Sequence, residues 1–196
     1  MKKLIYLDNA ATTKTSEEVV AAMLPYFTEY YGNPSSVYEF ASESKKAVSN
    51  ARRTIAETLG AQENEIYFTA GGSEADNWAL KATAEAYQSK GKHIITTKIE
   101  HHAILHTAEY LEKRGFEITY IGVDENGVVK VDELEKAIRP DTILISVMFA
   151  NNEIGTIQQS KKLDVLPKNM ASCSIQMQFR HLARYRSMWM NTTLIC

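Results

Sequence analysis

Hydrophobic and polar positions follow two rhythms along this chain, and the two rhythms succeed one another in regular order. Short apolar runs of strand length occupy 65–68, 93–97, 117–121 and 142–147. Stretches in which apolar residues recur every three or four positions, as in an amphipathic helix, occupy 73–88, 103–114 and 131–138. Strands that alternate with helices predict an α/β fold, in which helices cover both faces of a mainly parallel sheet.

The first 60 residues carry helical patterns with no strand between them. A helix is predicted over 16–30, where Ser16 is a suitable cap and Pro25 is expected to kink or split the helix. A second helix is predicted over 39–59, and Gly60 follows it as a typical residue beyond a helix end. We therefore expect an N-terminal arm of helices ahead of the sheet.

The composition is that of an ordinary globular protein and narrows the range of functions. The chain has 196 residues and a net charge of −2, which gives no reason to expect nucleic-acid binding. No apolar run is long enough to cross a membrane, and Asp8 interrupts the start of the chain too early for a signal peptide. We expect a cytoplasmic protein without membrane contact. The two Cys residues do not form a disulfide framework, and no metal site is predicted.

A glycine turn between a predicted strand and a predicted helix forms a candidate phosphate site. Gly71 and Gly72 let the backbone approach a ligand, and Ser73 is expected to cap the helix, whose first N–H groups attract an anion. The spacing matches neither of the common nucleotide-binding glycine motifs. A plain strand-to-helix turn is the alternative at this stage.

His101 is the second candidate for chemistry. It follows the predicted strand at 93–97 and precedes the helix at 103–114, so it lies at the carboxyl end of a strand, where open α/β sheets bind ligands. Its ring could stack on an aromatic cofactor or transfer protons. An ordinary polar loop residue is the alternative reading.

Five motifs together narrow these alternatives. They are Tyr-Leu-Asp-Asn-Ala-Ala-Thr-Thr at 6–13, Tyr-Gly-Asn-Pro-Ser-Ser at 31–36, Phe-Thr-Ala-Gly-Gly-Ser-Glu-Ala-Asp-Asn at 68–77, Glu-His at 100–101 and Asn-Asn-Glu-Ile-Gly at 151–155. In this order they resemble the cysteine desulfurases of the NifS/IscS type, which are pyridoxal-phosphate enzymes of the class V aminotransferase group. The resemblance implies that residues 1–158 form the N-terminal arm and the first part of the large, cofactor-binding domain of a fold-type-I enzyme.

The resemblance also implies roles in binding pyridoxal 5'-phosphate. Gly72 and Ser73 would hold the phosphate of the cofactor. His101 would stack on the pyridine ring and take part in catalysis, and Asn152 would lie beside the phenolic oxygen of the ring. The family usually has Ala-Thr in place of Gly72-Ser73, but the hydroxyl group is retained.

Substrate and partners follow from the same resemblance. Asn9 and Ala10 would contact the substrate, L-cysteine, from which the family removes sulfur to give alanine and an enzyme persulfide. That sulfur serves iron–sulfur cluster or thiocofactor assembly, so a sulfur-acceptor or scaffold protein is a further partner, and intact members form homodimers. Many members have His where this chain has Tyr38, which leaves the role of that position open.

The resemblance stops after Gln158, and residues 159–196 differ in composition. This tail holds both Cys residues, four of the seven Met residues, six of the 22 Lys and Arg residues and one of the 24 Asp and Glu residues. A helical or strand period is hard to find in it, so we expect it to be irregular. The family's cofactor-binding Lys, small domain and nucleophilic Cys loop do not follow, so we expect this chain to be inactive.

A shifted reading frame explains the change after Gln158. Met188-Trp189-Met190 has one possible coding sequence, ATGTGGATG. Read one nucleotide earlier, that sequence encodes Val-Asp after a codon that ends in AT. Gln176-Met177-Gln178 re-reads in the same way as Asn or Asp, then Ala, then Val or Ile, and the family has Asp-Ala-Val near this place. A divergent C-terminal extension is the alternative.

Other functions remain open from the sequence. The chain could derive from a selenocysteine lyase or another class V aminotransferase, which the missing C-terminal half would distinguish. It could also be a non-catalytic fragment that binds pyridoxal phosphate or docks onto a partner through the dimer surface. A different phosphate-bearing ligand for the glycine turn is the last alternative.

We predict that one C inserted after the Gln158 codon opens a reading frame that continues through a Ser-His-Lys-type motif into a second domain. The reason is that the forced codons of the tail encode family residues in the other frame. Sequencing the source DNA across this codon measures the outcome. A stop codon soon after the restored frame begins would contradict the prediction.

Overall fold

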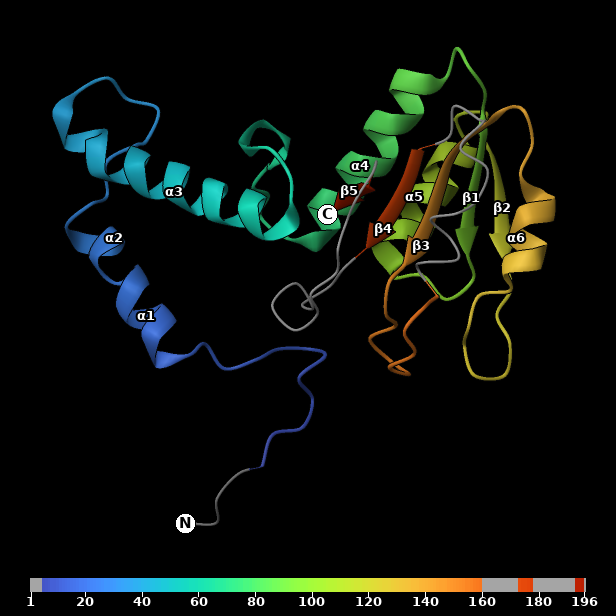
Figure 1. The fold of residues 1–196 in the computed structure, drawn as a ribbon, viewed down its shortest axis with the longest axis horizontal. Coiled ribbons are helices and arrows are strands. Elements are labelled where there is room, and N and C mark those ends of the chain that lie inside the picture. The colour runs from blue at the N-terminus through green and yellow to red at the C-terminus, as the bar shows by residue number, and fades with distance from the viewer. Residues whose placement is uncertain (1–4, 160–172, 178–192, 196) are drawn as a thin grey trace. The chain divides into compact units, whose positions relative to one another are not determined.

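The chain folds into two compact units. The computed structural model describes residues 5–159, 173–177 and 193–195 (Figure 1). The first unit, Met1–Tyr67, is called the N-terminal unit, and the second, Phe68–Cys196, is called the sheet unit. Among the described residues, all strands belong to the sheet unit, and those of the N-terminal unit form helices and connecting segments.

Short helices make up the N-terminal unit. They are α1 (Glu17–Met23), α2 (Pro25–Thr28), η1 (Glu39–Ala41), α3 (Ser42–Leu59) and η2 (Glu63–Glu65). The Ser16 side chain caps α1 by accepting a hydrogen bond from the Val19 N–H at 3.3 Å. Pro25 splits the predicted helix because it can begin α2 but cannot continue α1. Gly60 ends α3 with a φ of 68°, a left-handed conformation that favours glycine.

The strand predicted over 65–68 is wrong. Ile66 has an extended backbone after η2, but no strand pairs with it among the described residues. Its carbonyl accepts instead from the Arg52 Nε at 3.2 Å. The apolar run predicted a strand because its residues favour one, whereas a strand also needs a neighbour for its backbone groups.

Helices and strands alternate through the sheet unit as predicted. The order is α4 (Gly72–Tyr87), β1 (His93–Thr97), α5 (His102–Glu112), β2 (Glu117–Ile121), α6 (Val131–Ala137) and β3 (Thr142–Met148). β1 lies between β2 and β3 and is parallel to both. The predicted boundaries of the strands and helices agree with the observed ones to within two residues.

The expectation of an irregular tail is wrong for its described residues. β4 (Cys173–Met177) pairs in parallel with β3, and β5 (Thr193–Ile195) pairs in parallel with β4, which extends the sheet to the order β2-β1-β3-β4-β5. Within 173–177, Cys, Ile and Met alternate with Ser and Gln, which is the period of a strand. The rest of the tail lies outside the described residues, and the shifted frame stays a prediction.

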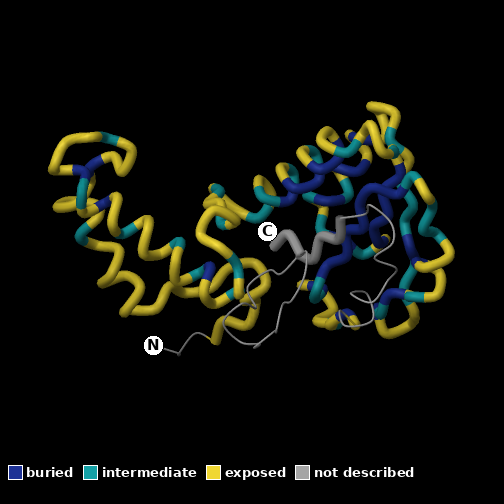
Figure 2. The backbone as a smooth tube through the Cα atoms, turned by 45° about the horizontal axis from the view of Figure 1, so that its top comes forward, coloured by how far each residue is buried: buried dark blue, intermediate teal, exposed yellow. Residues whose placement is uncertain are grey.

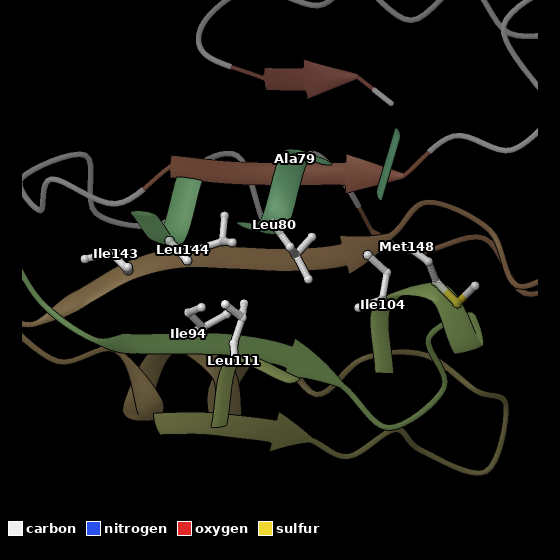
Figure 3. Packing of buried hydrophobic residues seen from close by; sticks show 9 residues of the cluster. Ala79, Leu80, Ile94, Ile104, Leu111, Ile143, Leu144 and Met148 are labelled. Atoms are coloured by element: carbon white, nitrogen blue, oxygen red, sulfur yellow. The ribbon is translucent and has the colours of Figure 1, made fainter. Parts of the chain in front are cut away.

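Buried hydrophobic residues lie on both faces of the sheet. Figure 2 shows that the buried backbone is concentrated in the sheet unit, and Figure 3 shows the cluster on one face. On one face, α4 and α5 pack on β1 and β3 through a cluster of buried residues: Ala79, Leu80, Ala84, Ile94, Ile104, Leu111, Ile143, Leu144 and Met148. On the other face, α6 covers a second cluster: Ile95, Ile121, Val129, Leu134, Ile145 and Val147. The neighbouring residues Ile94 and Ile95 of β1, and Leu144 and Ile145 of β3, belong to opposite clusters because side chains alternate along a strand. This confirms the α/β class with helices on both faces.

The apolar residues that recur along the predicted helix at 73–88 do not all face the sheet, so this pattern is partly wrong. Ala79 is buried, but Trp78 is 50% exposed. Polar residues contribute to the buried stripe, which consists of Asp76, Ala79, Leu80, Thr83 and Ala84. The apolar residues of α4 alone therefore do not mark the side of the helix that faces the sheet.

His93 joins three strands at the amino end of the sheet. It is fully buried, and its ring nitrogens form hydrogen bonds with Thr142 Oγ1 at 2.7 Å and Thr119 Oγ1 at 2.8 Å. One ring nitrogen donates and the other accepts in neutral imidazole, so the two hydroxyl groups can satisfy both. Burial lowers the pKa of His93, and the nearby Arg139 charge lowers this pKa further.

We predict that Leu80→Ala destabilises the sheet unit by about 2–5 kcal/mol, because Leu80 is 1% exposed and its loss leaves a cavity between α4 and the sheet. The matched control is Glu85→Ala, an exposed position of the same helix, which should change stability by no more than about 0.5 kcal/mol. Urea unfolding followed by circular dichroism measures both. Equal effects of the two variants would contradict the packing described above.

Candidate functional site

The first turn of α4 presents free backbone donors. Gly71 is the N-cap, with an extended backbone and no side-chain cap. Ser73 is the second residue of the helix, so the prediction that it caps α4 is wrong. No hydrogen bond among the described residues engages the backbone N–H of Gly72 or of Ser73. The Glu74 side chain instead contacts the segment before the helix, where its Oε2 accepts a hydrogen bond from the Ala70 N–H at 2.6 Å.

This turn fits an anion. Two unpaired N–H groups and the positive end of the helix dipole lie together at Gly72 and Ser73. The Ser73 side chain is exposed and adds a hydroxyl donor. A methyl group built on Gly71 would meet nothing within 4 Å, so the space beside the turn is open. A phosphate group therefore has both donors and room here.

His101 lies where the sequence predicted, between β1 and α5. It is the N-cap of α5, and its Nδ1 accepts a hydrogen bond from the Ala103 N–H at 3.1 Å. This bond fixes the direction of the ring and uses Nδ1 as an acceptor, which corresponds to the tautomer with its hydrogen on Nε2. The residue is half-buried, which leaves part of the ring accessible.

Asn152 lies in the loop after β3 and is exposed. Its Nδ2 donates to Glu153 Oε1 at 3.1 Å. The preceding residue, Asn151, is buried and shapes the loop: its Oδ1 accepts from the Glu153 N–H at 2.8 Å and from the Ile154 N–H at 3.0 Å. Its Nδ2 donates to the Ile99 carbonyl at 3.0 Å, which ties this loop to the one after β1. The two Asn residues of the motif thus have different environments.

Three of the candidate segments meet at one edge of the sheet. β1 and β3 are parallel, so the loops that carry His101 and Asn152 both leave the carboxyl edge. α4 leads into the start of β1, so its first turn lies at the other, carboxyl end of that strand (Figure 1). The fold therefore brings the segments of Gly72, Ser73, His101 and Asn152 to a common edge, as is usual for ligand sites of open α/β sheets.

Asn9 and Ala10 belong to the N-terminal unit. Both are exposed, and a turn surrounds them in which the Ala11 N–H donates to the Asp8 carbonyl at 3.2 Å. The two units are described separately, so the predicted contact of Asn9 and Ala10 with substrate stays a prediction.

Two buried carboxyl groups belong to the same edge, and the sequence analysis did not single them out. Glu100 is 6% exposed, and its Oε1 accepts from Thr97 Oγ1 and from the Met148 N–H, each at 2.8 Å. Asp76, on the buried side of α4, is 1% exposed. Burial raises the pKa of each carboxyl group to about 7. The spacing of Asp76 four residues before Leu80 was a signal for its burial, because residues four apart share a helix face.

Two further findings concern the described residues only. None of their helices is both long and apolar enough to cross a membrane. No group of three or more His, Cys, Asp or Glu side chains among them is arranged to hold a metal ion.

Known proteins match this chain in sequence. The model of the family described as "Aminotransferase class-V" matches residues 5–175, a range that extends beyond Gln158, where the motif resemblance stops. The cysteine desulfurase IscS of Methanosarcina thermophila is 61% identical over 166 residues, which are 85% of this chain and 41% of that protein. The cysteine desulfurase IscS of Clostridium botulinum (strain Kyoto / Type A2) is 60% identical over 168 residues, which are 86% of this chain and 42% of that protein.

Solved structures match the fold. A NifS-like protein superposes with a TM-score of 0.86 at 40% identity, over 90% of this chain and 49% of that one. A structure described as SspA in complex with cysteine superposes with a TM-score of 0.84 at 35% identity, over 88% of this chain and 50% of that one. The chain thus spans about half of these structures and about two-fifths of the curated relatives' length. Since the family model covers most of its residues, this chain belongs to the class-V aminotransferase family.

Proposed function

We propose that this chain is the phosphate-binding part of a cysteine desulfurase, and that the carboxyl edge of its sheet binds pyridoxal 5'-phosphate. The observation that carries the proposal is the pair of unpaired N–H groups at Gly72 and Ser73, at the same edge as His101. Similarity to the IscS relatives over 166 to 168 residues supports the choice of this cofactor and reaction.

The residues present fit the cofactor. Gly72 and Ser73 offer two backbone donors and one hydroxyl to a phosphate, and the open space at Gly71 admits it. His101 has a ring of fixed direction that can lie against a pyridine ring, because the Ala103 N–H holds its Nδ1. The Asn152 side chain is exposed and close in sequence to its only described side-chain partner, Glu153, so it can turn towards a phenolic oxygen.

Each of these groups has a definite task. When bound, pyridoxal phosphate withdraws electrons from the substrate carbon that bears the amine. The first turn of α4 binds and orients the phosphate without a positively charged side chain, through the helix dipole and its amides. His101 excludes water from one face of the ring and can hold or move a proton at Nε2.

L-cysteine is the proposed substrate, with Asn9 and Ala10 as its contacts. A relative of similar fold is described in complex with cysteine, which supports this substrate class. A homodimer and a sulfur-acceptor or scaffold protein are proposed as partners on the same grounds of family. A selenocysteine lyase or another class-V aminotransferase is the alternative, because the proposed site contacts the cofactor and does not distinguish which group is removed from the substrate.

We infer that the chain with the sequence given binds the cofactor but does not complete the reaction. It has no Lys in a Ser-His-Lys-type motif. Lys98, the Lys nearest to His101 in sequence, is exposed, and its backbone N–H pairs with Ile121 at the sheet. Cys173 lies in β4, within backbone pairing to β3, and not in a catalytic loop. A non-catalytic cofactor-binding or dimerisation fragment describes the chain in this form.

We predict that the purified chain releases no sulfide from cysteine in the presence of dithiothreitol and added pyridoxal phosphate. The physical reason is that, within the part of the chain that the structure describes, neither an activated nucleophilic thiolate nor a cofactor-bearing amine is placed at the sheet edge. Methylene-blue detection of sulfide measures the outcome against a heat-killed control. Sulfide production that disappears in Lys98→Ala or Cys173→Ser would show that one of these residues has the role denied to it here.

We predict that His101→Ala weakens binding of pyridoxal phosphate by about fivefold, because stacking of two aromatic rings is worth roughly 1 kcal/mol. Titration of the chain with the cofactor, followed by its visible absorbance, measures the dissociation constant. His102→Ala is the matched control, since His102 is exposed and stacks on His106 one helical turn away.

The control variant should bind the cofactor as the parent does. Equal affinities of the parent and His101→Ala would return His101 to the role of an ordinary helix cap. No binding by the parent at all would overturn the proposed cofactor site itself.

A further inference from the structure

Among the described residues of the sheet unit, four buried side chains each have an oxygen without a hydrogen-bond partner. The atoms are Asp76 Oδ2, Thr96 Oγ1, Glu100 Oε2 and Ser146 Oγ. These residues are 1%, 1%, 6% and 0% exposed, respectively. Buried polar groups nearly always have partners, because leaving them unpaired is costly. A proton on one of the two carboxyl groups would give this cluster a further hydrogen-bond donor.

Three of these residues, Ser146, Thr96 and Asp76, face the core between α4 and the sheet. Ser146 lies two residues before Met148 on β3, and Thr96 lies two residues after Ile94 on β1. Met148 and Ile94 both belong to the core cluster packed against α4 and α5, and side chains two apart on a strand share a face. Asp76 faces the same cluster from the buried stripe of α4.

Glu100 connects the two loops of the candidate site. Its Oε1 accepts one hydrogen bond from Thr97 Oγ1, at the end of β1, and one from the Met148 N–H, at the end of β3. Glu100 immediately precedes His101, and Met148 is four residues before Asn152. The Glu100 carboxyl group thus fixes the end of the strand before each of the two loops.

The donors and acceptors of this cluster do not balance if both acids are charged. Two carboxylates bring only acceptors, and both would lie in an interior from which water is excluded. Among the described residues, Asp76 is the only charged group that alters the pKa of Glu100, and it raises it. One proton on the pair supplies a donor and removes the repulsion between two buried charges.

We propose that Asp76 and Glu100 form a buried acid pair that holds one proton, and that Glu100 is a positioning residue for the loops of His101 and Asn152. The Oε1 of Glu100 keeps both loops in place, while the proton lies between its Oε2 and the Asp76 carboxyl group. The pair also connects α4, which carries Gly72 and Ser73, to those loops. The positioning role rests on the proposed cofactor site, whereas the shared proton does not.

The sign of the pH dependence follows from burial. Burial raises the pKa of Glu100 and of Asp76 to about 7, above their ordinary values. A raised carboxyl pKa contributes stability that is present below the ordinary pKa and is lost as the pH rises through the raised one. The folded sheet unit should therefore weaken as the pH increases towards and past about 7.

The test uses the full chain in a Trp189→Phe background, in which the fluorescence of Trp78 on α4 reports unfolding. Urea midpoints of the parent, Glu100→Gln, Glu100→Ala and Asp76→Asn are measured between about pH 5 and about pH 8.5. Gln has the shape of a protonated Glu, with an acceptor oxygen for Thr97 and Met148 and an N–H₂ donor for Asp76. The matched control is Glu85→Gln, which removes an exposed carboxylate of α4.

The midpoint of the parent and of Glu85→Gln should fall as the pH rises, whereas Glu100→Gln should have a clearly smaller slope. Hydrogen–deuterium exchange over 98–103 and 148–156 should remain parent-like in Glu100→Gln and become faster in Glu100→Ala. Pyridoxal-phosphate affinity should stay within about twofold of the parent in Glu100→Gln and fall about tenfold in Glu100→Ala.

Two results would overturn the proposal. A pH slope in Glu100→Gln as steep as that of the parent would show that the pair does not share a proton. Equal hydrogen–deuterium exchange of the loops in Glu100→Gln and Glu100→Ala would show that Glu100 does not position them, since the conservative change would then give no rescue. A parent that binds no pyridoxal phosphate would contradict the proposed function, and the pH slopes and loop exchange would still decide on the acid pair.

Discussion

Parallel pairing of β1 with β3 is the constraint on which the rest of the sheet unit depends. It requires the chain to return to the amino edge after each strand, so every strand begins at one edge and ends at the other. The helices make that return and cover the two faces as a result. The same requirement gathers all loops that follow strands, and the first turn of α4, at the carboxyl edge (Figure 1). Residues far apart in the sequence can therefore act on one ligand.

At this edge, side chains do what backbone pairing cannot. The ladder between β1 and β3 ends with the strands, so the loops beyond it need their own attachments. Glu100 provides one through the Met148 N–H, and Asn151 provides the other through the Ile99 carbonyl. The first attachment is buried and the second is partly buried, and hydrogen bonds are stronger electrostatically in such surroundings than in water. Short polar contacts thereby help to hold the loops of the candidate site.

Much of the sheet unit could be predicted from sequence because the spacing of its apolar residues matches the strands and helices that they form. The runs at 93–97 and 117–121 are strands with the predicted bounds, and His101 lies at a strand end as expected. The sequence was a poor guide where charged side chains are buried and where a strand depends on a neighbouring strand for its backbone hydrogen bonds. Asp76 and Glu100 are buried although charged side chains usually lie at the surface. The segment at 65–68 has no neighbouring strand among the described residues.

At each end of β1, a buried titratable side chain joins this strand to its neighbours. At the amino edge this is neutral His93 between two threonine hydroxyls. At the carboxyl edge it is the Glu100 carboxyl group. Burial opposes charge on both: it lowers the pKa of the base His93 and raises the pKa of the acid Glu100 to about 7. The two ends of β1 therefore respond to opposite changes of pH, the amino end to acid and the carboxyl end to alkali.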